Sequence, residues 1–452
     1  MTTRCARLMC IAALCAGAAT AAMAASPTDT GLSARIDDLF ADIAGASTPG
    51  AAVIVARNGK VLHSQGYGLA NIEHDVPNTP RTKFRLGSIT KSFTAAATLV
   101  LHERRLLDIE DPVGKHLPDV RDADLMTIRH LLTHTSGLSE SEEEPSLFAP
   151  GQRISYSNYG YSLLGRIMER VHGKSYEDCI DDLIFGPLSM VDSGYDHHTP
   201  ILKRRASGYA LGATGEYVNA EYTDMSGPYA AGGLYSTVAD MRLWDEALYG
   251  GTLLRPETLA LAFTRVKLDG GREGGYGMGW MLGEYRGLRE VAHGGDITGF
   301  NGFIARFPDE RFSVVVLSNV GMHPPSPLPS AGDLAHRITQ IYLGESMQPE
   351  EAFVETDVPA DVLAGYVGVY ELIAPEVVVN VAGDTFTVVQ EDGRLYSVTK
   401  MGKAALRAAS PTEFRQDGMP LTLTFTVDGD GRASEILISA GGLREFGAIR
   451  RD

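Results

Sequence analysis

The sequence predicts an α+β domain, in which helices flank an antiparallel sheet, followed by a small all-β barrel or sandwich. Residues 31–43 have the apolar spacing of an amphipathic helix, and two strands follow, joined by an Asn-Gly pair that favours a hairpin. More strands are expected between residues 277 and 318, before a last helix. Beyond residue 360, apolar residues alternate with period two between Asp-Gly turns, which is typical of a β-meander.

Length and composition are those of an ordinary globular protein with more than one domain. The chain has 452 residues, 44% of them hydrophobic and 21% charged, which allows two or three domains with their own cores. The formal net charge of −17 argues against nucleic acid or an anionic membrane surface as a partner. We expect the first domain over residues 32–345, a linker over 346–359 and the all-β domain over 360–452.

The first residues have the pattern of an export signal. Arg4 and Arg7 give a basic start, residues 8–22 form an apolar run, and Ala22-Met23-Ala24 is a small-residue cleavage site. The run is too short to span a membrane. The sequence therefore predicts a signal peptide over residues 1–24 and a mature protein that is periplasmic or secreted, without a membrane span.

The cysteines argue against an internal disulfide in the mature chain. Cys5, Cys10 and Cys15 lie in the predicted leader, so Cys179 alone remains. A single cysteine in a helical apolar pattern usually behaves as a small buried residue, and we expect this of Cys179.

Apolar periodicity and turn residues place the remaining elements in chain order. Helices are expected from Ser88 onward and at residues 127–137, 162–172 and 333–343. Strands of the first domain are expected at residues 51–56, 61–67, 277–282, 291–294, 302–307 and 313–318. Strands of the second domain are expected at residues 377–381, 385–390, 395–399, 421–427 and 435–439.

The candidate nucleophile is Ser88, which follows Gly87 and precedes Lys91 by one helical turn. In a helix the two side chains share one face, and Ser88 would lie where backbone N–H groups are unpaired and the dipole is positive. Serine needs a base, and lysine, with an ordinary pKa of about 10.4, serves near pH 7 only if burial or neighbouring cations lower that value. The Ser-x-x-Lys motif alone is weak evidence, because Ser397 and Lys400 have the same spacing in a predicted strand, where these positions point to opposite faces.

A second pattern, Tyr156-Ser157-Asn158, could complete such a site. Tyr156 could relay protons beside the serine and the lysine, and Asn158 could hydrogen-bond both the lysine and a substrate amide. This spacing is also weak alone, because Tyr217 and Asn219 repeat it.

The third pattern is His293-Gly294-Gly295-Asp296, which follows a predicted strand. Its paired glycines would let a substrate backbone lie along the strand edge. The N–H groups of Asp296 and Ser88 would then form an oxyanion hole. A lone histidine such as His293 is more often structural than catalytic, and the same holds for His130 and His134.

Together these patterns resemble the serine β-lactamase and penicillin-binding-protein superfamily. The likeness is to the branch of class C β-lactamases, D,D-peptidases, D-aminopeptidases and β-lactamase-like esterases, and it covers roughly residues 32–345. Its three motifs are matched by Ser88-x-x-Lys91, Tyr156-x-Asn158 and His293-x-Gly295, the last in place of K-T-G. Leu131–Gly137, Gly232-Gly233 and Tyr276–Trp280 are also similar to the family, and Leu363–Glu371 resembles a lipocalin-like barrel that is appended to some of these hydrolases.

The resemblance implies an acyl-enzyme mechanism that uses no cofactor and no metal. Lys91 and Tyr156 would deprotonate Ser88, and the backbone N–H groups of Ser88 and Asp296 would hold the oxyanion. Asn158, His293, Gly294 and Gly295 would contact a small-molecule or short-peptide substrate. Which of Lys91 and Tyr156 is the base stays open, as do the oligomeric state and the role of the barrel.

One departure from the family pattern bears on the substrate. Lysine in K-T-G helps to hold a substrate carboxylate, whereas this chain has His293 there and a negative charge on Asp296. Two charges about 4 Å apart near a protein surface interact by roughly 4 kcal/mol, so an anionic substrate end is disfavoured. The acidic stretch Glu140–Glu144, more simply a solvated loop, would act in the same direction if it bordered the site.

The expected function is therefore that of an exported serine hydrolase acting on a carboxylic ester, an amide or a short peptide. A β-lactamase or D,D-carboxypeptidase is the alternative. A non-catalytic protein that binds cell-wall peptides is a second alternative, although binding alone would not require Ser88, Lys91, Tyr156 and Asn158 together.

Overall fold

The computed structural model describes residues 27–451 apart from 42–44, 46, 322–328, 350–352, 375–378, 380–381, 420 and 441–443. The expected signal peptide and most of the expected strand 377–381 lie outside the described residues. None of the described helices is both long enough and apolar enough to cross a membrane.

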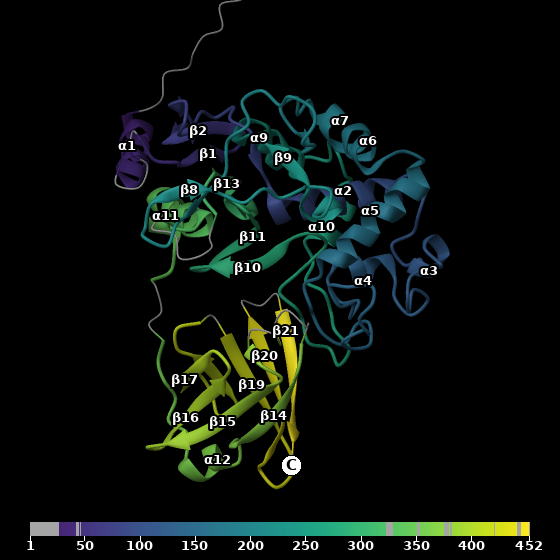
Figure 1. Cartoon of the computed structure of the whole chain (residues 1–452), viewed down its shortest axis with the longest axis vertical. Helices are drawn as coiled ribbons and strands as arrows, with labels where there is room; N and C mark the ends of the chain where they lie inside the picture. Colours follow the sequence, from purple (N-terminus) through teal and green to yellow (C-terminus); the bar gives the residue numbers. More distant parts are fainter. Residues whose placement is uncertain are drawn as a thin grey trace, which may run out of the picture.

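A six-stranded antiparallel sheet forms the centre of the N-terminal part, which confirms the predicted fold class (Figure 1). The strands are β1 (Ala51–Arg57), β2 (Lys60–Tyr67), β10 (Met281–Tyr285), β11 (Leu288–Ile297), β12 (Phe300–Phe307) and β13 (Phe312–Ser318). Their order is β10-β11-β12-β13-β1-β2, so the N-terminal hairpin lies beside the last strand of this part. β1 and β13 pair from Ala51 opposite Ser318 to Arg57 opposite Phe312.

Helices cover both faces of this sheet. Val53 and Val55 of β1 pack in one core with α1 (Pro27–Ala41) and α11 (Ala331–Leu343), whereas Ile54 points into the core on the opposite face. Successive side chains of a strand point to opposite faces. The run of apolar residues in β1 is therefore continuous because both of its faces are buried.

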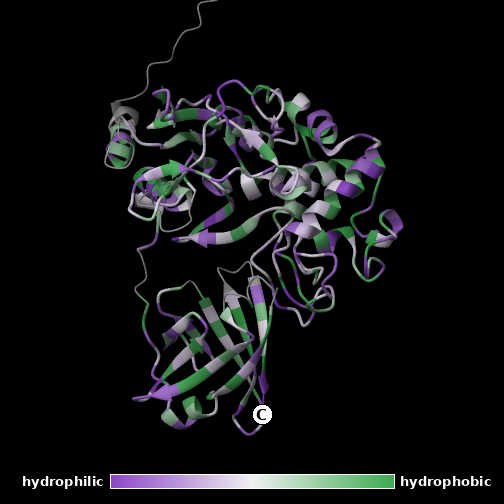
Figure 2. Cartoon of the chain, in the orientation of Figure 1, coloured by the Kyte–Doolittle hydropathy of each residue, from purple (hydrophilic) through white to green (hydrophobic). Residues whose placement is uncertain are grey.

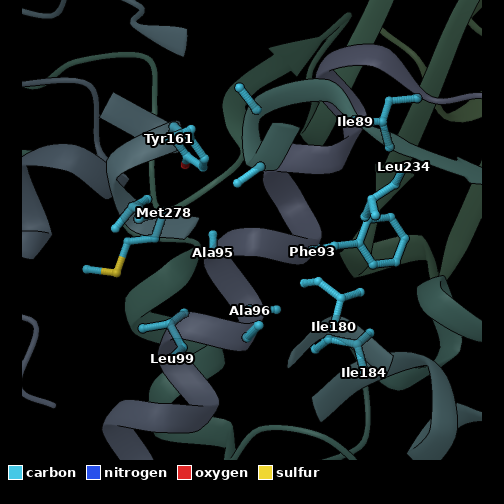
Figure 3. Close-up of a cluster of buried hydrophobic side chains, with 14 of the residues drawn as sticks. Ile89, Phe93, Ala95, Ala96, Leu99, Tyr161, Ile180, Ile184, Leu234 and Met278 are labelled. Carbon is cyan, nitrogen blue, oxygen red and sulfur yellow. The ribbon is translucent and has the colours of Figure 1, made fainter. Parts of the chain in front are cut away.

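The helix after Ser88 is buried on all sides. A 3-10 turn, η1 (Gly87–Ile89), leads into α2 (Thr90–Glu103), and residues 90–101 are all buried. Figure 3 shows side chains of η1 and α2 packed against residues of other segments, among them Tyr161, Ile180, Ile184, Leu234 and Met278. Close packing of this kind holds the start of α2, and with it Ser88, in one place.

The N-terminal part contains further helices and short strands, some of which pack against α2. The helices are α3 (Val113–His116), α4 (Ile128–Leu132), α5 (Asn158–His172), α6 (Tyr176–Ile180), η2 (Asp181–Phe185), α7 (Gly186–Leu188), α8 (Tyr229–Gly232), α9 (Val238–Ala247) and α10 (Pro256–Ala262). The short strands are β3 (Leu69–Asn71), β4 (Val76–Pro77), β5 (Phe84–Arg85), β6 (Gly194–Tyr195), β7 (Tyr209–Leu211), β8 (Tyr217–Asn219) and β9 (Leu234–Ser236). Turns η3 (Pro308–Glu310) and η4 (Gly344–Ser346) complete this part, and Cys179 is buried in α6.

Several expected elements have other bounds in the structure, among them the expected helix 127–137, which ends at Leu132. The expected helix 162–172 starts four residues earlier, because the Ser157 hydroxyl caps α5 by accepting the N–H of Gly160. The expected strand from residue 277 is wrong at its start. Residues 277–280 form a turn closed by the Gly277 N–H on the Trp280 carbonyl, with Gly279 at a φ of +80°, so β10 begins only at Met281.

The C-terminal part is a closed eight-stranded barrel whose strands follow one another in order. They are β14 (Gly368–Ile373), β15 (Thr385–Glu391), β16 (Arg394–Thr399), β17 (Gly402–Ala408), β18 (Glu413–Gln416), β19 (Leu421–Val427), β20 (Ala433–Ala440) and β21 (Arg444–Arg451). Helix α12 (Ala360–Ala364) precedes them. Figure 2 shows polar and apolar residues alternating along these strands, as the period-two pattern predicts.

Candidate active site

The structure brings Ser88 and Lys91 together at the start of the central helix. Lys91 Nζ lies 3.2 Å from Ser88 Oγ and donates to Asn158 Oδ1 at 2.8 Å and to the Ala231 carbonyl at 2.9 Å. Lys91 is 0% exposed, whereas Ser88 borders a cleft. The buried amine thus has three oxygen acceptors, one of them the candidate nucleophile.

The segment before α5 supplies two more side chains to the same place. Asn158 is the first residue of α5, whose start is capped by Ser157, and its side-chain oxygen accepts from Lys91 Nζ. Tyr156 lies in the preceding loop, with Lys91 Nζ 4.6 Å from the centroid of its ring. Tyr156, Asn158 and Ser88 border one cavity.

Two glycines allow β11 to approach η1 backbone to backbone. Gly87 has a φ of +51°, and a Cβ there would lie 3.0 Å from the amide nitrogen of Asp296. A Cβ on Gly295 would lie 1.9 Å from the Leu86 carbonyl oxygen, a distance that no side chain tolerates. Close packing on η1 therefore requires Gly295, in addition to any contact with substrate, and it brings the amide groups of Ser88 and Asp296 onto adjoining segments.

His293 is neutral and held by two partners. Its Nδ1 is 2.6 Å from the Gly294 carbonyl, which can only accept, so Nδ1 carries the proton and Nε2 accepts from the Tyr276 hydroxyl at 2.9 Å. Burial, and secondarily the charge of Lys91, lower the pKa of His293 to about 3, against a weaker opposing effect of the Gly294 carbonyl. His293 therefore supplies no positive charge to the cleft near pH 7.

This depressed pKa predicts an acid-sensitive contribution to stability. The unfolded chain protonates His293 near pH 6.5 but the folded chain only near pH 3, so the unfolded state binds more protons between these values. Between pH 7 and pH 5 the free energy of unfolding should fall by about 2 kcal/mol more in the wild type than in H293Q. Urea unfolding at the two pH values measures this, with H74Q, at an exposed histidine, as the control. Equal losses in all three proteins would contradict it.

Sequence reasoning missed two buried aromatic residues that pack against Tyr156, namely His134 and Tyr276. The His134 ring lies 4.3 Å from the Tyr156 ring and 4.6 Å from the Tyr276 ring, measured between centroids. His134 Nδ1 also accepts the N–H of Ser157 at 3.1 Å. Both residues belong to stretches that resemble the family, but a contact between residues so far apart in the chain has no local signal.

Glu140 lies at the cleft, whereas the sequence left open whether its acidic stretch borders the site or is only a solvated loop. Its carboxylate oxygens accept the N–H of Asn158 at 3.0 and 3.2 Å, at the positive N-terminus of α5. Glu140 and Ser88 border the same cavity. The acidic stretch thus contributes a negative charge beside the candidate nucleophile.

The cleft consists of two cavities that meet at Ser88. One has a volume of about 520 Å³ and is bordered by Glu140, Asn158 and Asp296; the other has a volume of about 550 Å³ and includes Tyr156 and His293. No lysine or arginine is found among the described residues that border them. Asp296 borders both cavities and Glu140 borders the first, so the described border of the cleft carries two carboxylates and no lysine or arginine.

The repeated motifs lie elsewhere. Ser397 is buried in the barrel strand β16, where its hydroxyl bonds Gln416 at 3.0 Å, and Tyr217 and Asn219 belong to the short strand β8. In the described part of the chain, no cluster of three or more His, Cys, Asp or Glu side chains could hold a metal ion.

Comparison with known proteins identifies a family and several proteins that this chain resembles. Residues 36–338 match the family described as Beta-lactamase. A penicillin-binding protein of Bacillus subtilis (strain 168) is 26% identical over 442 residues, 87% of this chain and 93% of that protein. D-amino acid amidase from Ochrobactrum anthropi SV3 matches with a TM-score of 0.61 and 25% identity, over 71% of this chain and 100% of that one. The crystal structure of SurE is similar in fold, with a TM-score of 0.70 and 24% identity, over 94% of this chain and 99% of that one.

Proposed function

The chain belongs to the beta-lactamase family, within the serine β-lactamase and penicillin-binding-protein superfamily, and on this premise we propose that it is an exported serine hydrolase of carboxylic esters, amides or short peptides. In this proposal residues 1–24 are removed on export. Residues 32–345 form the hydrolase domain, joined by a linker over 346–359 to the barrel over 360–452. The family is one of hydrolases, and the particular substrate and export are the proposed steps.

The reaction proceeds in two steps through an ester on Ser88. Ser88 Oγ attacks the carbonyl carbon while its proton passes to Lys91 or Tyr156, and the N–H groups of Ser88 and Asp296 stabilise the oxyanion. The bond to the leaving alcohol or amine breaks as that group takes up the proton. Water then attacks the acyl-enzyme and loses a proton to the same base, which passes it to Ser88 Oγ as the bond between the acyl group and that oxygen breaks and the acid is released.

The observation that carries this proposal is the environment of Lys91 Nζ. In its neutral form this buried amine donates its two N–H groups to Asn158 Oδ1 and the Ala231 carbonyl, and its nitrogen, 3.2 Å from Ser88 Oγ, can take the proton of that hydroxyl. A protein that only binds its ligand needs no such pair. The amidase relative supports the reaction class, because it shares the fold and acts, by its name, on an amide.

Intact-protein mass spectrometry tests the proposal directly. The protein is incubated with p-nitrophenyl acetate, a cephalosporin or a D-alanyl peptide, and its mass is followed. We expect a transient acetyl adduct that maps to Ser88. A stable cephalosporin adduct with fast release of D-alanine would identify a D,D-carboxypeptidase instead, and the lack of any adduct or turnover with all three would refute the hydrolase.

The negative charge of the cleft favours substrates that are neutral or carry an amine. Glu140 and Asp296 border the cavities, and His293 is neutral because burial lowers its pKa to about 3. A substrate carboxylate would thus meet negative charge, whereas an ammonium group would find a partner. An amide or ester of an amino acid with a free amine fits this field better than a β-lactam with its carboxylate.

Removal of the Glu140 charge should shift this preference. E140Q keeps an oxygen that can accept the Asn158 N–H but loses the charge, so kcat/KM for an anionic ester should rise relative to a cationic ester of equal size by about tenfold. E143Q removes an equal charge from an exposed position of the same loop and serves as the control. An unchanged ratio in E140Q would show that this carboxylate does not contribute to substrate choice.

A further inference from the structure

The barrel contacts the N-terminal part at the ends of its last two strands, where Glu445 of β21 makes most of the hydrogen bonds. Figure 1 shows the ends of β20 and β21 facing the N-terminal part. β21 pairs with β14 only from Gly447 onward, where Gly447 lies opposite Ile373. The N–H of Glu445 instead donates to the Ile154 carbonyl at 2.9 Å, and its carboxylate accepts the Ile154 N–H at 3.3 Å. Glu445 thus satisfies both backbone groups of Ile154.

Two arginines of the N-terminal part hold this contact. The Arg272 guanidinium donates to both carboxylate oxygens of Glu445, at 2.5 and 2.8 Å, and the Glu445 side chain is 7% exposed. Arg153 binds Glu435 of β20 and lies so close to β21 that a Cβ on Gly447 would be 2.1 Å from its Nη1. A planar, bidentate pair between an arginine and a buried carboxylate fixes orientation as well as distance.

This contact lies two residues before Tyr156. Ile154 is fully buried in a small cluster with Leu268 and Tyr276, and the Tyr156 ring packs against that cluster. On the other side, His134 accepts the N–H of Ser157 and its carbonyl accepts the N–H of Ser155. The backbone that carries Tyr156 is therefore held by His134 at the adjoining residues and by the barrel at Ile154.

We propose that Glu445 is a positioning residue through which the barrel aligns Tyr156 with Ser88 and Lys91. The proposal rests on the proposed hydrolase function, in which Tyr156 handles a proton of the reaction. Buried backbone groups require partners, so without the Glu445 carboxylate the Ile154 N–H must find another and the loop shifts. Small displacements of a catalytic group are sufficient to slow a reaction considerably. The barrel then contributes to the geometry of the active site, in addition to any effect on stability.

Kinetics of full-length variants test this assignment. E445A and R272A should each lower kcat for p-nitrophenyl acetate by about 10- to 100-fold with little change in KM, because the substrate cavities stay intact. E445Q, which keeps the acceptor for Ile154 but loses the charge, should retain more activity than E445A. E371A removes an exposed ion pair with Arg451 in the same barrel and should behave as the wild type.

A Y156F background separates positioning from a general loss of structure. If Glu445 acts through Tyr156, E445A/Y156F should have the same kcat as Y156F, whereas a destabilised fold would lower it further. Equal kcat values for E445A, R272A and E371A, or multiplicative losses in the double variant, would overturn the proposal. Should E445A fail to fold, R272A, whose arginine side chain is 44% exposed, carries the same test. Failure of the wild type to hydrolyse any ester would instead refute the hydrolase function itself.

Discussion

S88A should abolish turnover, with kcat/KM for p-nitrophenyl acetate reduced by about 10⁴-fold or more, and should leave no acyl adduct. In the proposed mechanism Ser88 Oγ is the atom to which the acyl group is transferred, and Lys91 Nζ lies 3.2 Å from it. The Ser88 hydroxyl lines the cleft and is not fully buried, so its removal leaves no cavity in the core. The thermal midpoint of S88A should therefore stay close to that of the wild type. Progress curves and intact mass measure the two effects.

The sequence offers a matched control for S88A. Ser397 has the same spacing to a lysine, but its hydroxyl bonds Gln416 inside the barrel. S397A should therefore keep full hydrolytic activity and lose at most some stability. Appreciable ester hydrolysis by S88A, or inactivity of S397A without unfolding, would contradict the assignment of the nucleophile.

K91M should reduce kcat by about 1,000-fold while substrate still binds, since general acid–base groups contribute roughly 10² to 10⁴. Lys91 Nζ is the amine within reach of Ser88 Oγ, and methionine fills its buried volume without a polar atom. Single-turnover acylation with p-nitrophenyl acetate, read as the burst of nitrophenolate, isolates the step in which Ser88 is deprotonated. We expect the rate of this burst to decrease in K91M by the same factor as kcat.

K91R distinguishes a base from a fixed positive charge. Arginine keeps the charge but does not lose its proton in a protein, so K91R should be as inactive as K91M if Lys91 accepts the Ser88 proton. Substantial activity of K91R would assign that step to Tyr156 and leave the lysine an electrostatic role. K400M, at the lysine of the repeated motif, is the control and should be fully active.

Short-range features of this fold were predictable because they depend on neighbours in the chain. The hairpin between β1 and β2 turns at Asn58 and Gly59, both at positive φ, as the Asn-Gly pair predicts. Barrel strands with strong alternation, such as β15 and β19, were also expected. Strands β17, with three alanines in seven residues, and β21, with a glycine within it, were missed, because their pairing in the closed barrel overrides weak local preference.

The sequence by itself determined the family, the reaction class it implies and the spacing of Ser88 to Lys91, because one helical turn fixes that distance whatever surrounds it. Only the tertiary structure decided what else meets there. Asn158 Oδ1 reaches Lys91 across 67 positions of the chain, and the barrel reaches Ile154 through Glu445 across 291. Such contacts are set by how sheet, helices and barrel pack together, and no local pattern encodes them. The acidic border of the cleft likewise depends on tertiary structure, which places Glu140 at the start of α5.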